Sequence, residues 1–144
     1  MDIICDIDGT LANIQYRLHW ITTKPKNWTA FFQTMIDDEP IQSVIDFLRL
    51  LNMREASVIY VSGRPDSHRL ETQSWLRRHS LPGGPLYMRR AGDHRPDDII
   101  KIELLAQIRN DGYDPKIAID DRVRVCRAWR RAGLICMQLN EEEF

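Results

Sequence analysis

The feature that most constrains the fold is the stretch at residues 3–11, where a short apolar run leads into two aspartates. The apolar members of the run are Ile3, Ile4, Cys5 and Ile7. This composition is typical of a strand that is buried on both faces, in the middle of a parallel sheet. Buried carboxylates are costly unless a positive charge offsets them, so Asp6 and Asp8 indicate a cation site or a chemical role. Gly9 allows the sharp turn that would aim both aspartates into a crevice beyond the strand.

An Asp-x-Asp-Gly sequence also occurs in calcium loops and in ordinary turns. Residues 10–17 do not support a calcium loop, because they lack the oxygen ligands and the closing glutamate of an EF-hand. The position after an apolar strand therefore favours a catalytic or metal-binding role.

The composition is that of an ordinary globular domain. At 144 residues the chain is expected to form a single domain, 1–144, whose core is stable without disulfides or structural metal ions. With 20 Lys+Arg against 21 Asp+Glu, a general attraction to nucleic acid is not supported, so a polyanion would need a local arginine cluster. The three cysteines have no CxxC spacing, which favours a reduced interior. The sequence shows neither an apolar stretch of membrane-spanning length nor a leader-like segment, so we expect a cytoplasmic protein without a membrane anchor.

The rest of the chain alternates between strand-like runs and amphipathic stripes. The expected strands are 3–7, 57–61, 85–88, 116–119 and 134–139, and the expected helices are 41–52, 67–79, 97–111 and 122–132. Strands separated by helices predict an α/β fold with a five-stranded parallel sheet and right-handed crossovers. Between the first strand and the first helix, residues 12–40 are irregular and aromatic, which predicts a loop with one or two short helices folded over the site. The aromatic residues Tyr16, Trp20 and Trp28 of this segment could stack on a nucleobase or form the core of a small cap. Trp28 is expected in the core, and Tyr16 at the site beside Arg17.

Polar side chains recur where the expected strands end. They are Asp6 and Asp8 after the first strand, Ser62 and Arg64 after the second, Lys101 on the helix after the third, and Asp120 and Asp121 after the fourth. The carboxyl ends of parallel strands share one edge of a sheet, so these residues are expected in one crevice. Hard oxygen ligands without histidine or cysteine favour Mg²⁺, and the whole set suits phosphoryl transfer.

Simpler explanations exist for the individual residues. Ser62 and Gly63 could form only a turn, and Asp97 and Asp98 could only cap the helix that they open. Lys101 could be only a surface partner of a residue one turn away.

Four motifs together resemble those of the haloacid dehalogenase (HAD) phosphohydrolase superfamily. They are Asp6-Ile-Asp-Gly-Thr-Leu11, Val61-Ser-Gly-Arg64, Lys101 and Ile119-Asp-Asp-Arg122. Residues 89–103 and 119–138 more narrowly resemble the 3'-phosphatase domain of phage polynucleotide kinase/phosphatases. The resemblance implies an HAD-type, Rossmann-like three-layer sandwich with a small cap-like insert, roughly 12–40, after the first strand.

The resemblance also implies a Mg²⁺-dependent phosphomonoesterase that works through an aspartyl phosphate. Asp6 would be the nucleophile and Asp8 the general acid and base. The implied Mg²⁺ ligands are Asp6, the main-chain carbonyl of Asp8, and Asp121, with Asp120 as a ligand or a support. The implied substrate-binding residues are Thr10, Arg17, Ser62, Gly63, Arg64 and Lys101, with Asp97 orienting one of the cations.

The sequence departs from the phage enzymes in two ways. It has no Gly-x-x-x-x-Gly-Lys-[Ser/Thr] motif, so a kinase or ligase partner would be a separate unit. Residues 18–39 do not match the usual insert of these enzymes. The favoured substrate is a polynucleotide 3'-phosphate, and a nucleotidase or another small-molecule phosphatase remains an alternative. A receiver-like signalling domain that accepts a phosphate is the alternative from another class, and the oligomeric state is open.

Overall fold

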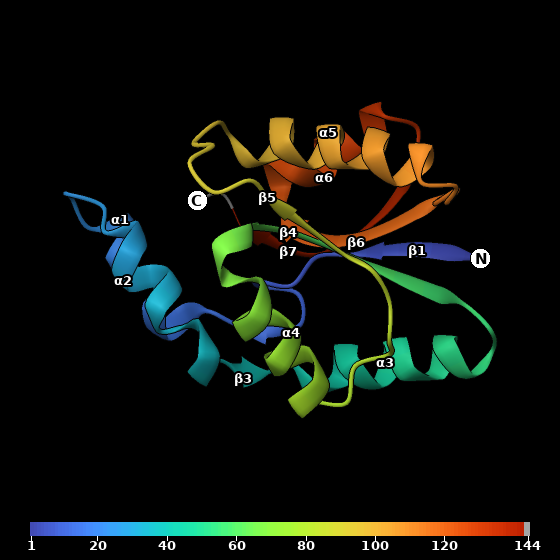
Figure 1. The fold of residues 1–144 in the computed structure, drawn as a ribbon, viewed down its shortest axis with the longest axis horizontal. Helices are drawn as coiled ribbons and strands as arrows, with labels where there is room; N and C mark the ends of the chain where they lie inside the picture. The colour runs from blue at the N-terminus through green and yellow to red at the C-terminus, as the bar shows by residue number, and fades with distance from the viewer. Residues whose placement is uncertain (143–144) are drawn as a thin grey trace.

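The computed structural model describes residues 1–142 and contains a five-stranded parallel sheet with helices on both faces (Figure 1). The strands of the sheet are β1 (Asp2–Cys5), β4 (Ser57–Pro65), β5 (Leu86–Arg89), β6 (Ile117–Arg122) and β7 (Ile135–Glu142). The helices that cover it are α3 (Gln42–Met53), α4 (Arg69–Arg78), α5 (Asp97–Asn110) and α6 (Val123–Arg131). The predicted α/β fold with a five-stranded parallel sheet is confirmed. The last two residues of the expected 1–144 unit lie outside the described residues.

Alternate side chains of β1 build two separate cores, because successive residues of a strand point to opposite faces. Ile3 and Cys5 pack with α3 and α4 on one face, and Ile4 packs with α5 and α6 on the other. All three side chains are at most 2% exposed. The continuous apolar run at the start of the chain is therefore explained by burial on both faces of the sheet.

The strand order β5-β4-β1-β6-β7 puts β1 at the centre of the sheet. Cys5, the last residue of β1, pairs in register with Tyr60 of β4 and Ile119 of β6, and all three strands run parallel. From β1 the chain continues to β4 and β5 on one side and then returns across the sheet to β6 and β7 on the other, so a crevice opens outside the carboxyl ends of β1, β4 and β6. The residues that follow β1 and those at the ends of β4 and β6 are thereby collected at one edge.

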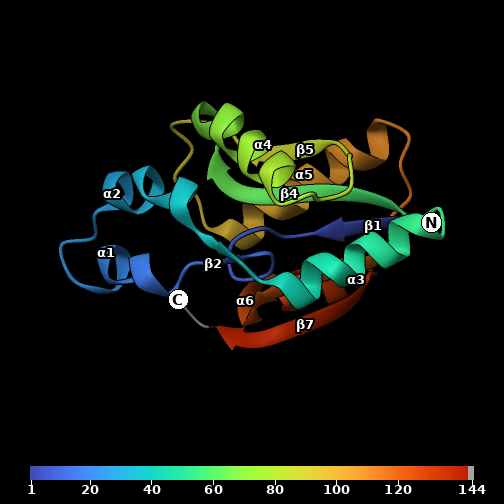
Figure 2. The ribbon, with the colours of Figure 1, turned by 90° about the horizontal axis from the view of Figure 1, so that it is seen from below.

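The segment after β1 forms an insert whose two ends are paired with each other. Strands β2 (Ala12–Asn13) and β3 (Glu39–Pro40) are antiparallel and join the ends of the insert. Between them lie η1 (Gln15–Arg17), α1 (His19–Thr22), α2 (Trp28–Gln33) and η2 (Met35–Asp37). A small core of buried Ile14, Ile21 and Phe31 holds the insert together. Figures 1 and 2 show α1 and α2 beyond the carboxyl ends of the strands, as expected for a cap-like insert.

Several boundaries differ from the sequence prediction. Strand β4 continues through Ser62-Gly63-Arg64 to Pro65, with a register shift against β5 between Ser62 and Pro65. A 3₁₀ turn, η3 (Asp66–His68), precedes α4, which begins two residues later than predicted. Among residues 1–142, no helix is both long enough and apolar enough to cross a bilayer.

Candidate active site

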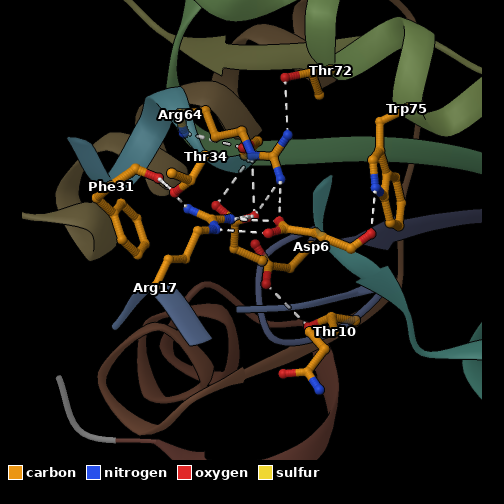
Figure 3. Close-up of polar contacts among 12 residues, drawn as sticks. Asp6, Thr10, Arg17, Phe31, Thr34, Arg64, Thr72 and Trp75 are labelled. Carbon is orange, nitrogen blue, oxygen red and sulfur yellow. Dashed lines mark hydrogen bonds and ion pairs between the residues drawn. The ribbon is translucent and has the colours of Figure 1, made fainter. Parts of the chain in front are cut away.

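Asp6 is the first residue after β1, and its two carboxylate oxygens have different partners. Lys101, on the second turn of α5, lies 2.7 Å from Asp6 Oδ1 through its Nζ atom. The hydroxyl of Thr10 donates to Asp6 Oδ2 at 3.0 Å (Figure 3). All three residues are at most 4% exposed. The α5 helix and the turn after β1 therefore fix the orientation of the Asp6 carboxylate.

Asp120 and Asp121, at the end of β6, are both buried but differ in their contacts. Asp120 accepts hydrogen bonds from Lys101 Nζ, the indole of Trp129, and the main-chain N–H groups of Asp121 and Arg122. In the described part of the chain, neither side-chain oxygen of Asp121 has a hydrogen-bond partner. A Cβ at Gly9 would lie 2.0 Å from Asp121 Oδ2, so only glycine allows this approach. Orphaned buried oxygens are rare, so Asp121 is a candidate ligand of a cation.

Asp6, Asp120 and Asp121 form a cluster that a divalent cation would fit. One carboxylate oxygen from each lies within 4.8 Å of the others. Burial and Asp120 raise the pKa of Asp6 well above its usual value, although Lys101 opposes the shift. Burial and the Asp120 carboxylate likewise raise the pKa of Asp121 to about 7. The cluster thus carries more negative charge than Lys101 offsets, and its oxygen ligands suit a hard cation.

The Asp8 carboxylate is held by two buried arginines, Arg17 and Arg64. Arg64 Nε lies 3.1 Å from Asp8 Oδ1, and Arg17 Nη2 lies 3.0 Å from the same oxygen. Burial alone would raise the pKa of Asp8, but Arg64 and Arg17 lower it to about 2. The Asp8 carboxylate is therefore ionised while both guanidinium groups contact it.

Asp38, which the sequence analysis did not assign to the site, holds the same two arginines from the other side. It accepts from Arg17 Nε at 2.8 Å and from Arg17 Nη2 at 2.7 Å, and Arg64 Nη2 lies 3.4 Å away. Its side chain is fully buried, and it also accepts from the hydroxyl of Tyr16 at 2.7 Å. A buried arginine needs a counter-charge, but this signal does not distinguish Asp38 from its neighbour Asp37.

Arg64 is fixed by further contacts on the core side. Its Nη1 donates to Thr72 Oγ1 of α4 at 3.1 Å, and its main-chain N–H donates to Ser62 Oγ at 3.1 Å. Ser62 is 1% exposed and lies at the same edge of the sheet as Asp6. The Ser62-Gly63-Arg64 segment is thus part of strand β4 and not a free turn.

Asp97 opens α5 and joins three cations near the mouth of the site. Its carboxylate lies 3.2 Å from Arg89 Nη2, 3.2 Å from Arg122 Nη1 and 3.7 Å from Lys101 Nζ. A Cβ at Gly63 would lie 2.0 Å from Asp97 Oδ1, so the glycine lets this carboxylate pack against β4. Asp97 therefore contacts three cations in addition to opening the helix.

A cleft of about 470 Å³ opens at Asp6 and Asp8 between the insert and the loop that precedes α5. Trp28 lines it and is 46% exposed, so the expectation that Trp28 lies in the core of the insert is wrong. The buried aromatic residue of the insert is Phe31, whose ring lies 4.2 Å from the guanidinium carbon of Arg17. Tyr16 contacts Asp38, so it reaches the site through that residue.

Comparisons with known proteins agree with this geometry. The model of the PNKP polynucleotide kinase phosphatase domain matches residues 1–144. Two structures of Pnkp1/Rnl/Hen1 complexes, one called an RNA repair complex, contain chains that are 31% and 32% identical, with TM-scores of 0.83 and 0.84. These comparisons cover 99% of this chain but only 46% and 43% of the other chains.

More distant relatives share the sequence pattern or the fold. A protein of Autographa californica nuclear polyhedrosis virus, described as a putative bifunctional polynucleotide kinase/RNA ligase, is 26% identical over 130 residues. That match covers 89% of this chain and 17% of the viral protein. A class C acid phosphatase from Bacillus anthracis has the same fold, with a TM-score of 0.70 at 16% identity over 99% of this chain and 67% of that one. Because the family model matches the whole chain, this protein belongs to the family of PNKP polynucleotide kinase phosphatase domains.

Proposed function

We propose that the chain is a Mg²⁺-dependent phosphomonoesterase that removes 3'-phosphates from polynucleotide ends. The observation that carries the proposal is the Asp6 carboxylate, which Lys101 and Thr10 orient beside the orphaned oxygens of Asp121. A fixed carboxylate next to a cation site can attack phosphorus while the surrounding positive charge stabilises the transferring group. Family membership favours a phosphatase over the receiver domain that the sequence left open.

The proposed reaction uses Asp6 and Asp8 in two steps. An oxygen of Asp6 bonds to phosphorus as the bond to the leaving 3'-oxygen breaks, and Asp8 gives that oxygen its proton. Asp8 then takes a proton from a water molecule, whose oxygen attacks phosphorus and releases phosphate from Asp6. In the resting site Arg17 and Arg64 hold the pKa of Asp8 at about 2, against the effect of burial. A phosphate that competes for these arginines would raise this pKa and allow Asp8 to carry the proton.

The proposed Mg²⁺ ligands are Asp6, Asp121 and the main-chain carbonyl of Asp8. We assign Asp120 to a supporting role, because its oxygens already accept from Lys101, Trp129 and two main-chain N–H groups. The ion would supply positive charge opposite the transferring phosphoryl group. The surplus of buried carboxylate around Asp121 supports a divalent cation at this position.

The proposed phosphate cradle consists of groups at the ends of β1 and β4 and on α5. Lys101 would contribute a positive charge, and Ser62, Gly63 and Thr10 would contribute donors around the phosphate. Arg64 and Arg17 would bind its remaining oxygens, and Asp97 would keep Lys101 in place. The short distances from Lys101 to Asp6 and from Arg64 to Asp8 support this assignment, since a phosphate bound to those cations would lie beside both carboxylates.

The choice of a polynucleotide substrate rests on family membership and on the named relatives. The chain spans less than half the length of the similar chains in the Pnkp1/Rnl/Hen1 complexes. We propose that residues 1–144 form one phosphatase unit that works in the cytoplasm beside a kinase or ligase unit. Because one of those complexes is called an RNA repair complex, RNA repair is the setting that we propose for this chain.

Phosphate release in the presence of Mg²⁺ tests the proposal. The substrates are 3'-phosphorylated and 5'-phosphorylated oligonucleotides and the corresponding mononucleotides. We expect release from the 3'-phosphorylated oligonucleotides, a loss on the order of 10³-fold or more in Asp6→Asn because the nucleophile is missing, and no loss in Asp46→Asn. Asp46 is an exposed aspartate of α3 and serves as the matched control. Equal activity of Asp6→Asn and wild type would refute the mechanism, and exclusive release from mononucleotides would refute the substrate.

A further inference from the structure

The cleft has an aromatic wall that the proposed chemistry does not use. We define this aromatic wall as Trp28 and Phe32 of α2 together with His68 of η3. The Trp28 and Phe32 rings are stacked, with centroids 5.9 Å apart and an interplanar angle of 23°. The Phe32 and His68 rings follow at 5.7 Å and 32°. Three side chains from two separate segments thus line the cleft with rings that contact one another.

The aromatic wall borders the core of the insert, because Phe32 packs against that core and Phe31 contacts both Trp28 and Phe32 edge-on. Phe31 packs inside that core with Ile14 and Ile21 and is 3% exposed, whereas Trp28 on the same helix is 46% exposed. Lys26 lies 5.9 Å over the Trp28 ring, but it is an exposed side chain that a ligand can displace. The Trp28 ring contacts the Phe31 ring edge-on at 5.6 Å, and 46% of Trp28 stays exposed, in the lining of the cleft. Its position in the cleft suggests that it contacts a ligand.

The remaining lining of the cleft defines what such a ligand carries. Asp6 and Asp8 line the cleft, and so do Arg122 at the end of β6 and Arg124 on the first turn of α6. Arg124 pairs with Asp98 at 3.0 Å, and its side chain is 62% exposed. The volume of about 470 Å³ lies within the range of roughly 300–1,000 Å³ that is usual for small-molecule sites. A group that is attached to a phosphate at Asp6 therefore has room beside the aromatic wall.

We infer that the aromatic wall stacks on the nucleobase of the terminal nucleotide, and that Trp28 supplies most of the stacking surface. This inference rests on the proposed function, because it places the phosphate of that nucleotide at Asp6. Stacking on an aromatic side chain tightens binding on the order of tenfold per base and tolerates every base, since each base has a π face. The wall accordingly selects phosphates that are carried by a nucleoside, with little preference for base identity.

A pair of oligonucleotides that differ only at the terminal base tests the inference. One ends in a 3'-phosphorylated nucleotide and the other in a 3'-phosphorylated abasic sugar. We expect the wild type to show a KM on the order of tenfold lower for the base-bearing end. Trp28→Ala should reduce this ratio to within about twofold, and Trp28→Phe should retain most of it because it keeps a ring. Trp20→Ala, at an exposed tryptophan of α1 that packs on His19, is the matched control and should keep the full ratio.

The outcomes separate this inference from the proposed function. If the wild type hydrolyses both ends with the same KM, the aromatic wall does not bind the base, although the phosphatase assignment stands. If neither end is hydrolysed, the proposed function fails, and binding then tests the wall directly. In that case we would measure how a 3'-phosphorylated dinucleotide quenches the tryptophan fluorescence of the folded wild type and of Trp28→Phe. This comparison shows whether Trp28 contacts the base. Quenching that is lost with Trp28 supports the inference, and quenching that is unchanged in Trp28→Phe overturns it.

Discussion

Replacing Asp38 with asparagine tests the buried charge cluster that joins the insert to the sheet. The carboxylate of Asp38 accepts from Arg17 Nε and Nη2 and from the Tyr16 hydroxyl, and the Arg17 side chain is fully buried. Removing one partner of a buried ion pair usually costs about 3–5 kcal/mol, because the other charge remains buried. Arg17 keeps its contacts with Asp8 and with the carbonyl of Phe31, and the asparagine oxygen can still accept one hydrogen bond. We therefore expect a loss near the lower limit, about 3 kcal/mol.

Thermal unfolding followed by circular dichroism measures this loss. The unfolding entropy is about 2.1 cal/mol/K per residue, or about 300 cal/mol/K for 144 residues, so about 3 kcal/mol corresponds to a fall in Tm of about 10 °C. Asp37→Asn is the matched control, because Asp37 is the exposed neighbour of Asp38. Its Tm should change by less than about 2 °C, as surface substitutions usually cost under about 0.5 kcal/mol.

Hydrogen exchange adds a local readout to the melting experiment. Since Asp38 and Arg17 lie near the two ends of the insert, the amides of residues 15–37 should exchange faster in Asp38→Asn than those of β1 and β4. A Tm within about 3 °C of the wild type would mean that the cluster contributes less than about 1 kcal/mol. Such a result would refute the conclusion that these buried charges hold the insert in place.

Three further substitutions probe the site. Asp121→Asn should raise the Tm in EDTA and abolish the stabilisation by Mg²⁺, which is about 2.7 kcal/mol at one hundred times Kd, because its orphaned oxygens need a cation. Burial and the adjacent carboxylate raise the pKa of Asp121 to about 7. In EDTA the free energy of unfolding of the wild type should therefore fall as the pH rises from about 4 to 7, because the protonated form of Asp121 is the more stable one in the folded protein. Asp121→Asn should flatten this dependence of stability on pH, and an unchanged dependence would contradict the reasoning. Arg64→Lys should lower kcat/KM on the order of 10²-fold in a phosphate-release assay, because a point charge replaces a planar fork; near-normal kinetics would place Arg64 outside the chemistry. Gly63→Ala should lower the free energy of unfolding by about 1–3 kcal/mol by displacing Asp97, whereas Gly83→Ala, with no atom of residues 1–142 within 4 Å of its new Cβ, should not.

The sheet was predictable because its strands and helices are long enough to show a period. The run at Ile3 and Ile4 is apolar on both faces of the sheet and the stripe of α3 is apolar on one face of the helix, so these patterns predicted the correct elements. Strands β2 and β3 have two residues each and show no alternation, and they were not predicted. The extension of β4 to Pro65 was also missed, because Ser62-Gly63-Arg64-Pro65 has the composition of a turn.

The acidic and basic residues at the strand ends were predictable for a different reason. In a parallel sheet the carboxyl ends coincide, so Asp6, Lys101 and Asp121 could be brought together without knowledge of any contact. Asp38 could not, since its partners Arg17 and Arg64 lie 21 and 26 residues away and its neighbour Asp37 is chemically identical. Trp28 was assigned to the wrong environment, because aromatic residues in a short helix do not reveal which side faces a cleft.

The pairing of β2 with β3 has a consequence for how enzymes of this kind can be rebuilt. Ala12 pairs with Pro40 and Asn13 with Glu39, so the insert leaves and rejoins the scaffold through one narrow neck. A graft of another length at this neck would add little closure entropy, because doubling a loop costs only about 0.6 kcal/mol. Arg17 and Asp38 are part of the exchanged segment, however. Arg17 contacts Asp8 and Asp38 contacts Arg64, and Asp8 and Arg64 remain in the scaffold. A functional chimera must therefore carry an arginine and a carboxylate of its own at the positions of Arg17 and Asp38, whichever substrate the new insert binds.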